Sequence, residues 1–260
     1  MRQSAKASIN WIGLFTIVRR DVWHISDSPI QNLFTPWFSA LLFIFVFGYV
    51  VGSGVAPIGG YRYLEFMLPG VLMMNIVNVA VLQSSSAIYF SRLFRYSEEM
   101  LVTPLSYTEM ILGGLSVVVI RACFTSIGIL LIGVVFGATH VESWPMFLFW
   151  IGSVSIVFGL LGIIIGLCSK EAEQFVTPLI FLTPLSMVGG VFNTVSMLPS
   201  WLRWLAYGNP FFYFISGIRG AMIGLDEAPA GLGAGLTLAL LAILGTVTWQ
   251  LYAKGYGLRE

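Results

Sequence analysis

Charged residues are scarce in this 260-residue chain, and their scarcity excludes most classes of soluble protein. Asp, Glu, Lys and Arg make up 10% of the sequence, and hydrophobic residues make up 57%. Soluble domains carry roughly 25% charged residues and about 45–50% apolar ones. The composition therefore indicates an all-α integral membrane protein. The formal net charge is only +1. Without an excess of positive charge to attract phosphate backbones, nucleic-acid binding is not expected.

Lysine is rarer still, and this excludes one common route to ATP hydrolysis. The lysines are Lys6, Lys170 and Lys254, and none of them follows glycine or precedes serine or threonine. A P-loop needs that arrangement, because the lysine and the neighbouring hydroxyl act together on the nucleotide phosphates and Mg²⁺. Glu98 and Glu99 are adjacent, but neighbours on a helix point about 100° apart and make a poor acid/base pair. We therefore expect no catalysis by this chain and no cofactor bound to it.

Cysteine and histidine are too few and too scattered for a metal centre. Cys123 and Cys168 lie far apart in apolar stretches, and we interpret both as small buried apolar residues without a disulfide. His24 and His140 fall on opposite faces of the membrane in the topology given below. A metal site shared by the two histidines is therefore excluded.

Long gaps between ionisable residues mark the membrane segments. A charge near the bilayer centre costs a few kcal/mol or more, and about 20 apolar residues cross the hydrocarbon core. One of the gaps, from Glu109 to His140, is interrupted only by Arg121. The gaps predict six transmembrane helices near residues 32–52, 65–88, 109–136, 146–168, 175–194 and 231–252.

The apolar stretch from Trp204 to Gly217 is too short to be a seventh span. As a helix it reaches about 22 Å, against a hydrocarbon core of roughly 30 Å. We expect a re-entrant helical hairpin there, with breaks at Pro199, at 208–210 and at Gly217. The chain is then one membrane domain with four parts: an interfacial helix (1–31), spans one to five (32–192), a re-entrant extracytoplasmic segment (193–230), and span six with a cytoplasmic tail (231–260).

The distribution of arginine and lysine gives the orientation. Nine of them lie on the side that carries both chain ends, and three lie on the other side. The positive-inside rule therefore places both termini in the cytoplasm. Between Ile9 and Ile25, apolar residues recur at spacings of three and four, which predicts a helix lying along the cytoplasmic membrane surface. No cleavable signal peptide is expected.

The segment 90–106, FSRLFRYSEEMLVTPLS, is a dense polar patch between spans two and three on the predicted cytoplasmic side. Arg92, Arg95, Glu98 and Glu99 can form i,i+3 and i,i+4 pairs that support a short helix, which Thr103 and the following proline end. A transporter without an ATP site or an evident ion-coupling site needs an external source of energy. This segment is suited to dock it, and an ordinary solvated loop is the alternative.

An ion-coupled secondary transporter, or a channel or scaffold without an ATPase partner, is the alternative function. Such carriers usually place ionisable groups near the bilayer midplane and often have repeated halves. Arg121 is the only formally charged residue near the centre of a predicted span, and no convincing internal repeat is found. Arg121 either faces a polar pathway or stabilises packing beside a helix dipole or a serine cluster.

Three stretches of the chain resemble the membrane subunits of ABC-2 type transporters, in particular the YadH-like and nodulation-protein J-like permeases. They are FMLPGVLMMN at 66–75, EEMLVTPLS at 98–106, and 182–225, which contains a Gly-Gly break, Leu198-Pro199, Asn209-Pro210 and the run ISGIR. The number of predicted spans and the length also agree, so the resemblance covers essentially the whole chain. It implies the ABC-2 exporter fold and transport out of the cell.

The resemblance also implies partners and a location. Such permeases lie in the inner (plasma) membrane among lipids and pair with a second copy of themselves. They also bind two copies of a separate ATP-binding subunit, which holds the ATP and Mg²⁺. The segment that carries Arg92, Arg95, Glu98, Glu99 and Thr103 would be the coupling helix that enters a cleft of that ATPase.

In such a dimer the substrate path lies between the two copies, with walls from spans one, two and five. Candidate residues are the aromatic Phe45 and Tyr49 of span one, and Asn75 and Asn78 of span two. The two asparagines are three residues apart and share a helix face. Packing between helices is their alternative role.

Four aromatic residues of the re-entrant segment, Trp201, Trp204, Phe211 and Phe212, are candidates for a gate or a stacking surface. Aromatic side chains also collect at membrane interfaces for reasons unrelated to a substrate, which is the alternative interpretation. Apolar walls suit a small or lipidic amphiphile, such as a drug or a lipid. Aromatic platforms and hydroxyl groups would instead suit a lipid-linked glycan.

Overall fold

A computed structural model describes residues 34–94 and 106–257 of the chain. It also describes these residues of the first segment: Trp11, Gly13, Phe15, Thr16, Val18, Arg19 and Trp23. Within this described part the regular structure is helical, apart from one isolated antiparallel bridge between Ile58 and Tyr61. The all-α expectation is therefore confirmed for these residues.

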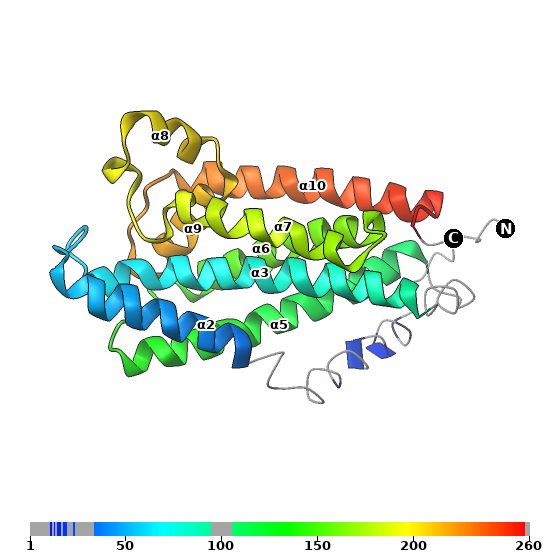
Figure 1. Cartoon of the computed structure of the whole chain (residues 1–260), viewed down its shortest axis with the longest axis horizontal. Helices are drawn as coiled ribbons and strands as arrows, with labels where there is room; N and C mark the ends of the chain where they lie inside the picture. The colour runs from blue at the N-terminus through cyan, green and yellow to red at the C-terminus, as the bar shows by residue number, and fades with distance from the viewer. Residues whose placement is uncertain are drawn as a thin grey trace.

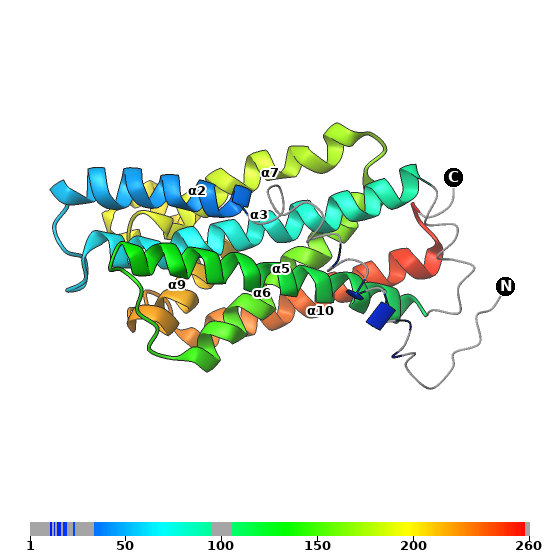
Figure 2. The ribbon, with the colours of Figure 1, turned by 90° about the horizontal axis from the view of Figure 1, so that it is seen from below.

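The helices pack side by side in an elongated bundle (Figure 1), and the view from below shows the same lengthwise arrangement (Figure 2). Most of them run along the long axis of the molecule, and successive long helices run in opposite directions. The long elements are α2 (Thr35–Phe43) with its π-helical continuation η2 (Ile44–Val51) and the short turn η3 (Gly52–Gly54), α3 (Tyr63–Leu93), α5 (Tyr107–Val135), α6 (Trp144–Cys168), α7 (Ala172–Ser186) with the π-helical turn η4 (Met187–Val191), and α10 (Ala230–Lys254).

The two ends of the bundle differ. One end carries α8 (Ser200–Tyr207) and the loops 55–62 and 136–143, and we call it the α8 end (Figure 1). The other end carries the last turns of α3, α6 and α10, and we call it the Arg92 end.

Within the described residues, five helices are long and apolar enough to cross a membrane: Thr35–Gly54, Tyr63–Leu93, Tyr107–Val135, Trp144–Cys168 and Ala230–Lys254. Each contains most of one predicted span. The predicted fifth span, 175–194, corresponds to α7 and η4, and its apolar helical part is Val176–Val191. That part is about 24 Å long at 1.5 Å per residue, which is shorter than the hydrocarbon core of roughly 30 Å.

Helix α3 is the centre of the bundle. In its most apolar window 83% of the residues are buried, against 17% for Thr35–Gly54 and 11% for α10. Its most extensive contact is with α6, where Gly162 and Gly166 face the α3 backbone. A Cβ atom on Gly162 would lie 2.7 Å from the Val81 carbonyl oxygen, and one on Gly166 would lie 2.7 Å from the Ser85 carbonyl oxygen. Small residues four apart thus allow the two backbones to approach closely.

The segment after η4 forms two helices of different character. Helix α8 follows Pro199, and α9 (Pro210–Ile223) begins after the Asn209 cap, whose side-chain oxygen accepts a hydrogen bond from the Phe211 N–H at 3.0 Å. Helix α9 packs against α3, α6, α10 and η4, whereas α8 projects from the bundle (Figure 1). The expected breaks at Pro199 and at 208–210 are confirmed.

Gly217 does not interrupt the chain as its sequence predicted. It was predicted to break the re-entrant path, but it lies inside α9 with helical neighbours on both sides. The indole ring of Trp150 on α6 packs so tightly against Gly217 that a Cβ atom there would overlap the ring. The glycine therefore serves close packing between α6 and α9, and it ends no helix.

Cys168 is a second correction. The sequence predicted two buried cysteines, but Cys168 ends α6 and is exposed, whereas Cys123 is partly buried. A surface helix was predicted in the first segment, and the described residues of that segment are helical. Trp11, Phe15 and Trp23 are exposed there, and the remainder of that prediction lies outside the described residues.

The start of α5 is fixed by a capping box. The Ser106 hydroxyl accepts a hydrogen bond from the Glu109 N–H at 3.3 Å, and the Glu109 carboxylate accepts one from the Ser106 N–H at 2.6 Å. Each bond satisfies a backbone donor that has no partner within the helix.

We expect Ser106→Ala to lower the free energy of unfolding by about 1 kcal/mol, because it removes this cap. Ser116→Ala on the same helix is the control, since the Ser116 hydroxyl only donates to the Leu112 carbonyl one turn earlier. Denaturant unfolding of both variants in mild detergent measures the difference. A Ser106→Ala protein as stable as the Ser116→Ala protein would contradict the capping role.

Candidate functional site

The predicted coupling segment begins at the end of α3, where Arg92 makes three contacts with the end of α6. Its Nη1 donates to the carbonyl oxygens of Gly166 and Leu167 at 3.1 Å and of Ser169 at 2.9 Å. A guanidinium at a helix C-terminus satisfies carbonyl groups that have no intrahelical partner and complements the helix dipole. Arg92 therefore ties the end of α3 to the end of α6.

The other residues predicted for this segment are Arg95, Glu98, Glu99 and Thr103, and they lie outside the described residues. Their docking role stays a prediction. The structure shows the two helix ends that this segment connects. Arg92 fixes the end of α3 to α6, and Ser106 caps the start of α5.

The polar candidates of the predicted path lie on α3 and α5. Asn75 is buried, and its side-chain amide donates to the Val71 carbonyl one turn earlier at 2.9 Å. Asn78 is partly buried. Arg121 lies at the middle of α5 and is also partly buried. The Asn75 hydrogen bond lies within α3 and joins no second helix. The pathway roles of Asn75, Asn78 and Arg121 stay predictions.

The aromatic candidates fall into two groups. Phe45 and Tyr49 on η2 are exposed and stack with ring centroids 6.1 Å apart. Trp201 and Trp204 on α8 are 73% and 82% exposed. All four side chains are therefore free in a single copy of the chain to meet lipid, a second copy or a substrate.

The second group is buried in the bundle. Phe211 and Phe212 are 1% and 3% exposed. Phe211 packs against Phe158 of α6 at 5.2 Å between ring centroids, and Phe212 packs against Tyr207 at 5.5 Å. In this conformation the two phenylalanines are core residues of the α8–α9 region, so a gating role would require α9 to move.

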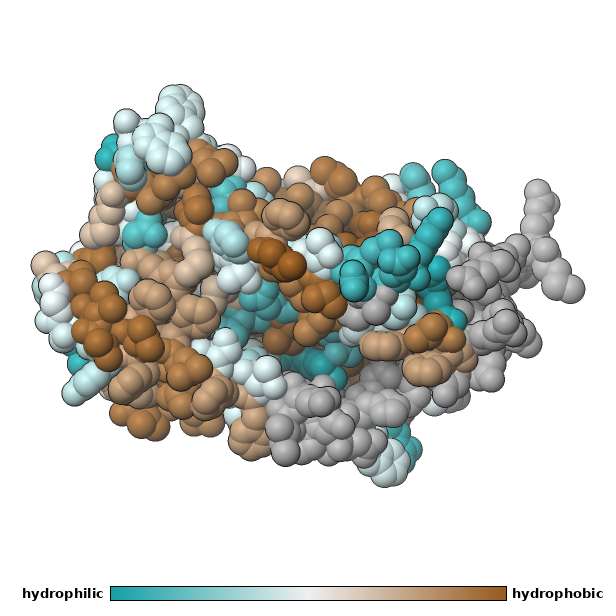
Figure 3. All heavy atoms as spheres, in the orientation of Figure 1, coloured by the Kyte–Doolittle hydropathy of each residue, from teal (hydrophilic) through white to brown (hydrophobic). Residues whose placement is uncertain are grey.

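The exposed face formed by α2, α3 and α7 combines apolar and polar surface (Figure 3). Hydrophobic side chains cover α2, and hydrophilic side chains gather at the Arg92 end beside the start of α7. A smaller hydrophilic patch lies in a recess in the middle of this face, over α3 and α5. A polar patch within an apolar face is what a pore or a contact between subunits would present.

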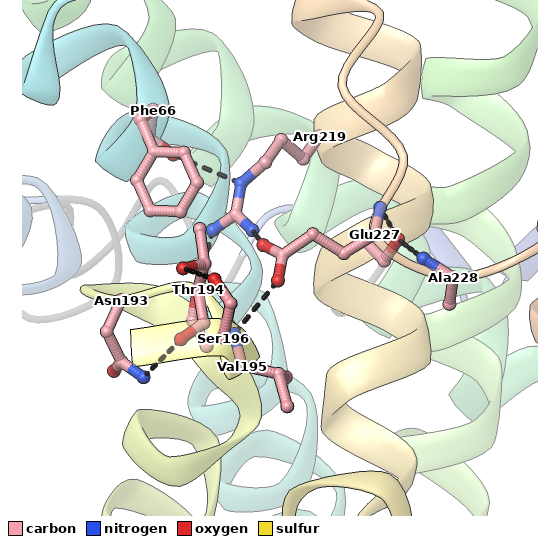
Figure 4. A network of polar contacts seen from close by, with 10 residues as sticks. Phe66, Asn193, Thr194, Val195, Ser196, Arg219, Glu227 and Ala228 are labelled. Atoms are coloured by element: carbon pink, nitrogen blue, oxygen red, sulfur yellow. Dashed lines mark hydrogen bonds and ion pairs between the residues drawn. The ribbon is translucent and has the colours of Figure 1, made fainter. Parts of the chain in front are cut away.

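Sequence reasoning missed a buried polar network centred on Arg219. Its side chain is 1% exposed and extends from α9 between three other segments (Figure 4). It donates to the Phe66 carbonyl at 3.3 Å and to the Gly190 carbonyl at 2.6 Å, and it pairs with the Glu227 carboxylate at 2.5 Å. The guanidinium also lies 3.8 Å from the centroid of the Phe66 ring, within reach of a cation–π interaction.

Glu227 extends this network to the chain that precedes α8 (Figure 4). Its second carboxylate oxygen accepts a hydrogen bond from the Val195 N–H at 3.0 Å. The Ser216 hydroxyl accepts hydrogen bonds from the backbone N–H groups of Glu227 and Ala228 at 3.0 and 2.9 Å. The Arg219–Glu227 pair thus joins α3, the end of η4, α9 and the loop 224–229.

The π-helical turn η4 contains one of the joined positions, Gly190, next to its last residue. Gly190 has a φ of 98°, a conformation that glycine adopts without steric cost, and its carbonyl is the one that accepts from Arg219. The Asn209 amide also donates to the Leu185 carbonyl at 2.6 Å, just before η4. Arginine and asparagine side chains therefore satisfy carbonyl groups where the helix becomes irregular.

A hollow of about 650 Å³ opens beside this network at the α8 end, and we call it the outer hollow. Its walls come from the loop before α3, the chain around η5 (Val195–Met197), the α8–α9 region and the loop 224–229. A second hollow of about 610 Å³ lies along α2 and is lined mainly by apolar residues from Phe34 to Leu42. Among the described residues, no three His, Cys, Asp or Glu side chains are grouped to hold a metal ion.

Comparison with known proteins gives one family. The model of the ABC-2 type transporter family matches residues 13–223. Inner membrane transport permease YadH of Escherichia coli (strain K12) is 28% identical over 251 residues, which cover 96% of this chain and 98% of that protein. Nodulation protein J of Sinorhizobium fredii (strain NBRC 101917 / NGR234) is 25% identical over 248 residues, covering 93% and 90%. Probable multidrug ABC transporter permease YbhR of Escherichia coli (strain K12) is 28% identical over 156 residues, covering 58% and 42%.

Proposed function

Because the chain belongs to the ABC-2 type transporter family, and is thus the transport permease of an ABC transporter, we propose that it exports small or lipidic amphiphiles. In this proposal two copies form the path, two separate ATP-binding subunits drive it, and the complex lies in the inner membrane. Its relatives include an inner membrane transport permease and a probable multidrug ABC transporter permease. These names support the location and the substrate class.

The observation that carries the proposal is the anchoring of the predicted coupling segment. Arg92 fixes the end of α3 to α6 immediately before residues 95–105, and α3 is the most deeply buried of the five long helices. A push on that segment would therefore act on the centre of the bundle through two helices at once. This is the mechanical property that an ATP-driven permease needs.

We further propose six spans with both termini in the cytoplasm, so that the Arg92 end faces the cytoplasm. In this arrangement α7 and η4 form the fifth, shorter span, and α8 with α9 form the re-entrant segment. The apolar helix Val176–Val191 is shorter than the hydrocarbon core. It can still cross if the bilayer thins locally or if neighbouring helices shield its ends from lipid.

The face with Phe45 and Tyr49 is proposed to meet the second copy and to line the path. The exposed rings of Phe45 and Tyr49 and a recessed hydrophilic patch over α3 and α5 (Figure 3) would together suit an amphiphile, which has both kinds of surface. The two copies would then shield polar groups whose exposure to the hydrocarbon core of the bilayer is energetically costly.

Charge reversal in the coupling segment tests the proposal. We expect Glu98→Lys with Glu99→Lys to lower ATP turnover of the complex about tenfold, because like charges placed across an interface repel. Glu171→Lys with Glu173→Lys is the matched control, since both residues are exposed in the other loop of the predicted cytoplasmic side. That control should keep turnover within about twofold.

The readout is ATP hydrolysis by the permease purified with its co-expressed ATP-binding subunit in lipid nanodiscs. Membrane insertion of each variant is checked by its yield and by its elution as a single species. Equal turnover in the two double variants would overturn the coupling assignment. Failure of any ATP-binding subunit to co-purify with the intact chain would overturn the proposed partnership.

A further inference from the structure

The outer hollow has the size and composition of a small-molecule site. Its volume of about 650 Å³ falls within the roughly 300–1,000 Å³ of typical ligand pockets. Three chain segments and two aromatic residues form its walls: 55–59, 194–197, 225–227, Tyr207 and Phe212. Most of these residues are apolar, with a few polar groups among them, as expected for a site that binds an amphiphile.

The charged residues that line the hollow are of one sign. Asp226 and Glu227 line it, and the described lining includes no lysine, arginine or histidine. Both carboxylate oxygens of Glu227 already have partners, because one pairs with Arg219 and the other accepts a hydrogen bond from the Val195 N–H. The guanidinium of Arg203 lies outside this lining and donates to the carbonyls of Ser196 and Leu198. Asp226 is therefore the one carboxylate of the described lining that has no ion pair.

Asp226 is placed by the turn that ends α9. Gly224 closes the helix in the left-handed conformation, with a φ of 67°, and the chain then returns so that the Asp226 carboxylate rests directly on Gly220. No hydrogen bond or ion pair to this carboxylate occurs among the described residues. Burial raises the pKa of Asp226 above its usual value, as expected for a carboxylate that is partly removed from water with no cation beside it.

Tyr207 supplies an aromatic surface at the same hollow. It is 52% exposed, and its ring packs edge to face against Phe212. The face of an aromatic ring attracts cations, and more strongly where water is partly excluded. A carboxylate and an aromatic ring in one apolar hollow thus favour a cation that also carries apolar groups.

We propose that the outer hollow binds the organic cationic group of an amphiphile through Asp226 and Tyr207. The inference names the substrate class of the proposed export function and rests on that function for its biological meaning. The hollow lies at the α8 end, which the proposed topology places outside the cytoplasm. A cation bound there would be a substrate at the exit of its path.

Two ions of the same shape and opposite charge test the inference on the full chain in nanodiscs without an ATPase. We expect tetraphenylphosphonium to bind above the level of empty nanodiscs. Asp226→Asn should weaken this binding about three- to tenfold, because a partly exposed charge pair contributes modestly. Tetraphenylborate should bind no more weakly to Asp226→Asn than to the unchanged chain, since its charge is negative.

Two further variants separate the site from lipid partitioning and from misfolding. Glu142→Gln removes an exposed carboxylate at the same end that does not line the hollow, so tetraphenylphosphonium binding should be unchanged. Ala56→Trp fills the hollow and should weaken binding while the chain still elutes as a folded species. Equal binding of tetraphenylphosphonium to the unchanged chain, Asp226→Asn and Ala56→Trp would overturn the inference, as would binding no greater than to empty nanodiscs.

This test is separable from the test of coupling. If tetraphenylphosphonium does not bind but reversal at Glu98 and Glu99 lowers ATP turnover, only the cation site is wrong. If the cation binds through Asp226 but no ATP-binding subunit associates with the chain, the binding site stands and the proposed ATP-driven export is wrong.

Discussion

Arg219→Met is expected to lower the free energy of unfolding by roughly 3–5 kcal/mol, because removing one partner of a buried ion pair leaves the other without compensation. The Glu227 carboxylate would keep only its bond from Val195. The carbonyls of Phe66 and Gly190 would also lose their donor, and buried polar groups without partners are costly. Urea unfolding in mild detergent, followed by tryptophan fluorescence, measures the loss.

Arg203→Met is the matched control for this prediction. Arg203 also donates to two backbone carbonyls at the α8 end, but it is exposed. Its loss should cost less than about 1 kcal/mol, because water can replace an exposed donor. If Arg203→Met and Arg219→Met were equally stable, the role of the Arg219 network in stability would be refuted.

A double-mutant cycle isolates the ion pair. Glu227→Gln leaves the buried guanidinium with a neutral partner, so it should also destabilise the protein. In the double variant neither charge remains uncompensated, and its loss of stability should be smaller than the sum of the single losses by at least about 1 kcal/mol. Arg219→Lys should lie between the unchanged chain and Arg219→Met. A lysine keeps the charge, but it lacks the planar fork that reaches Phe66, Gly190 and Glu227 together.

The long helices could be predicted because the bilayer penalises charge. The gap between Glu142 and Lys170 predicted a span at 146–168, and α6 is Trp144–Cys168. The predicted span 65–88 is longer in the structure, as α3 runs from Tyr63 to Leu93. The extension beyond 88 includes Arg92, which a rule based on charge gaps excludes. Its guanidinium is nevertheless accommodated by the carbonyls at the end of α6.

Arg219 could not be placed by the same rule. The positive-inside count places Arg219 with Arg62 and Arg203 on the extracytoplasmic side. A buried arginine is acceptable only if a carboxylate and carbonyl groups are brought to it. Those partners come from residues 66, 190 and 227, and only the last is near in sequence. An arginine inside the apolar run ISGIRGAMIGL with a carboxylate eight residues later was the available signal.

The side of each helix that is buried could also not be predicted from the sequence. Helices such as α3 and α5 carry apolar residues on every side, so their pattern gives no preferred direction for burial. Asn75 was a candidate for the path and Phe211 for a gate, and both are buried within one copy. Tyr49 and Trp204, assigned on the same grounds, are exposed. Only the packing of the neighbouring helices distinguishes the two groups.

The contact between α3 and α6 is the other place where a single substitution is expected to have a large effect. A Cβ atom on Gly162 would meet the Val81 carbonyl oxygen at 2.7 Å and the Ser84 Cβ at 2.8 Å. Neither atom can move without the α3 helix. Gly162→Leu should therefore separate the two helices and lower the free energy of unfolding by roughly 3 kcal/mol or more, at the upper end of overpacking effects.

Gly152→Ala provides the opposite result on the same helix. Among the described residues, no atom outside the neighbouring turns of α6 lies within 4 Å of a Cβ placed on Gly152, so the substitution adds no clash. Alanine also has the higher helix propensity, so Gly152→Ala should be neutral or stabilise the protein by up to about 1 kcal/mol. The two variants are compared by urea unfolding in the same detergent. Because α6 also anchors Arg92, folded Gly162→Leu protein should support less ATP turnover in the complex than Gly152→Ala. Equal stability of the two variants would show that close approach of α3 and α6 does not hold the bundle together.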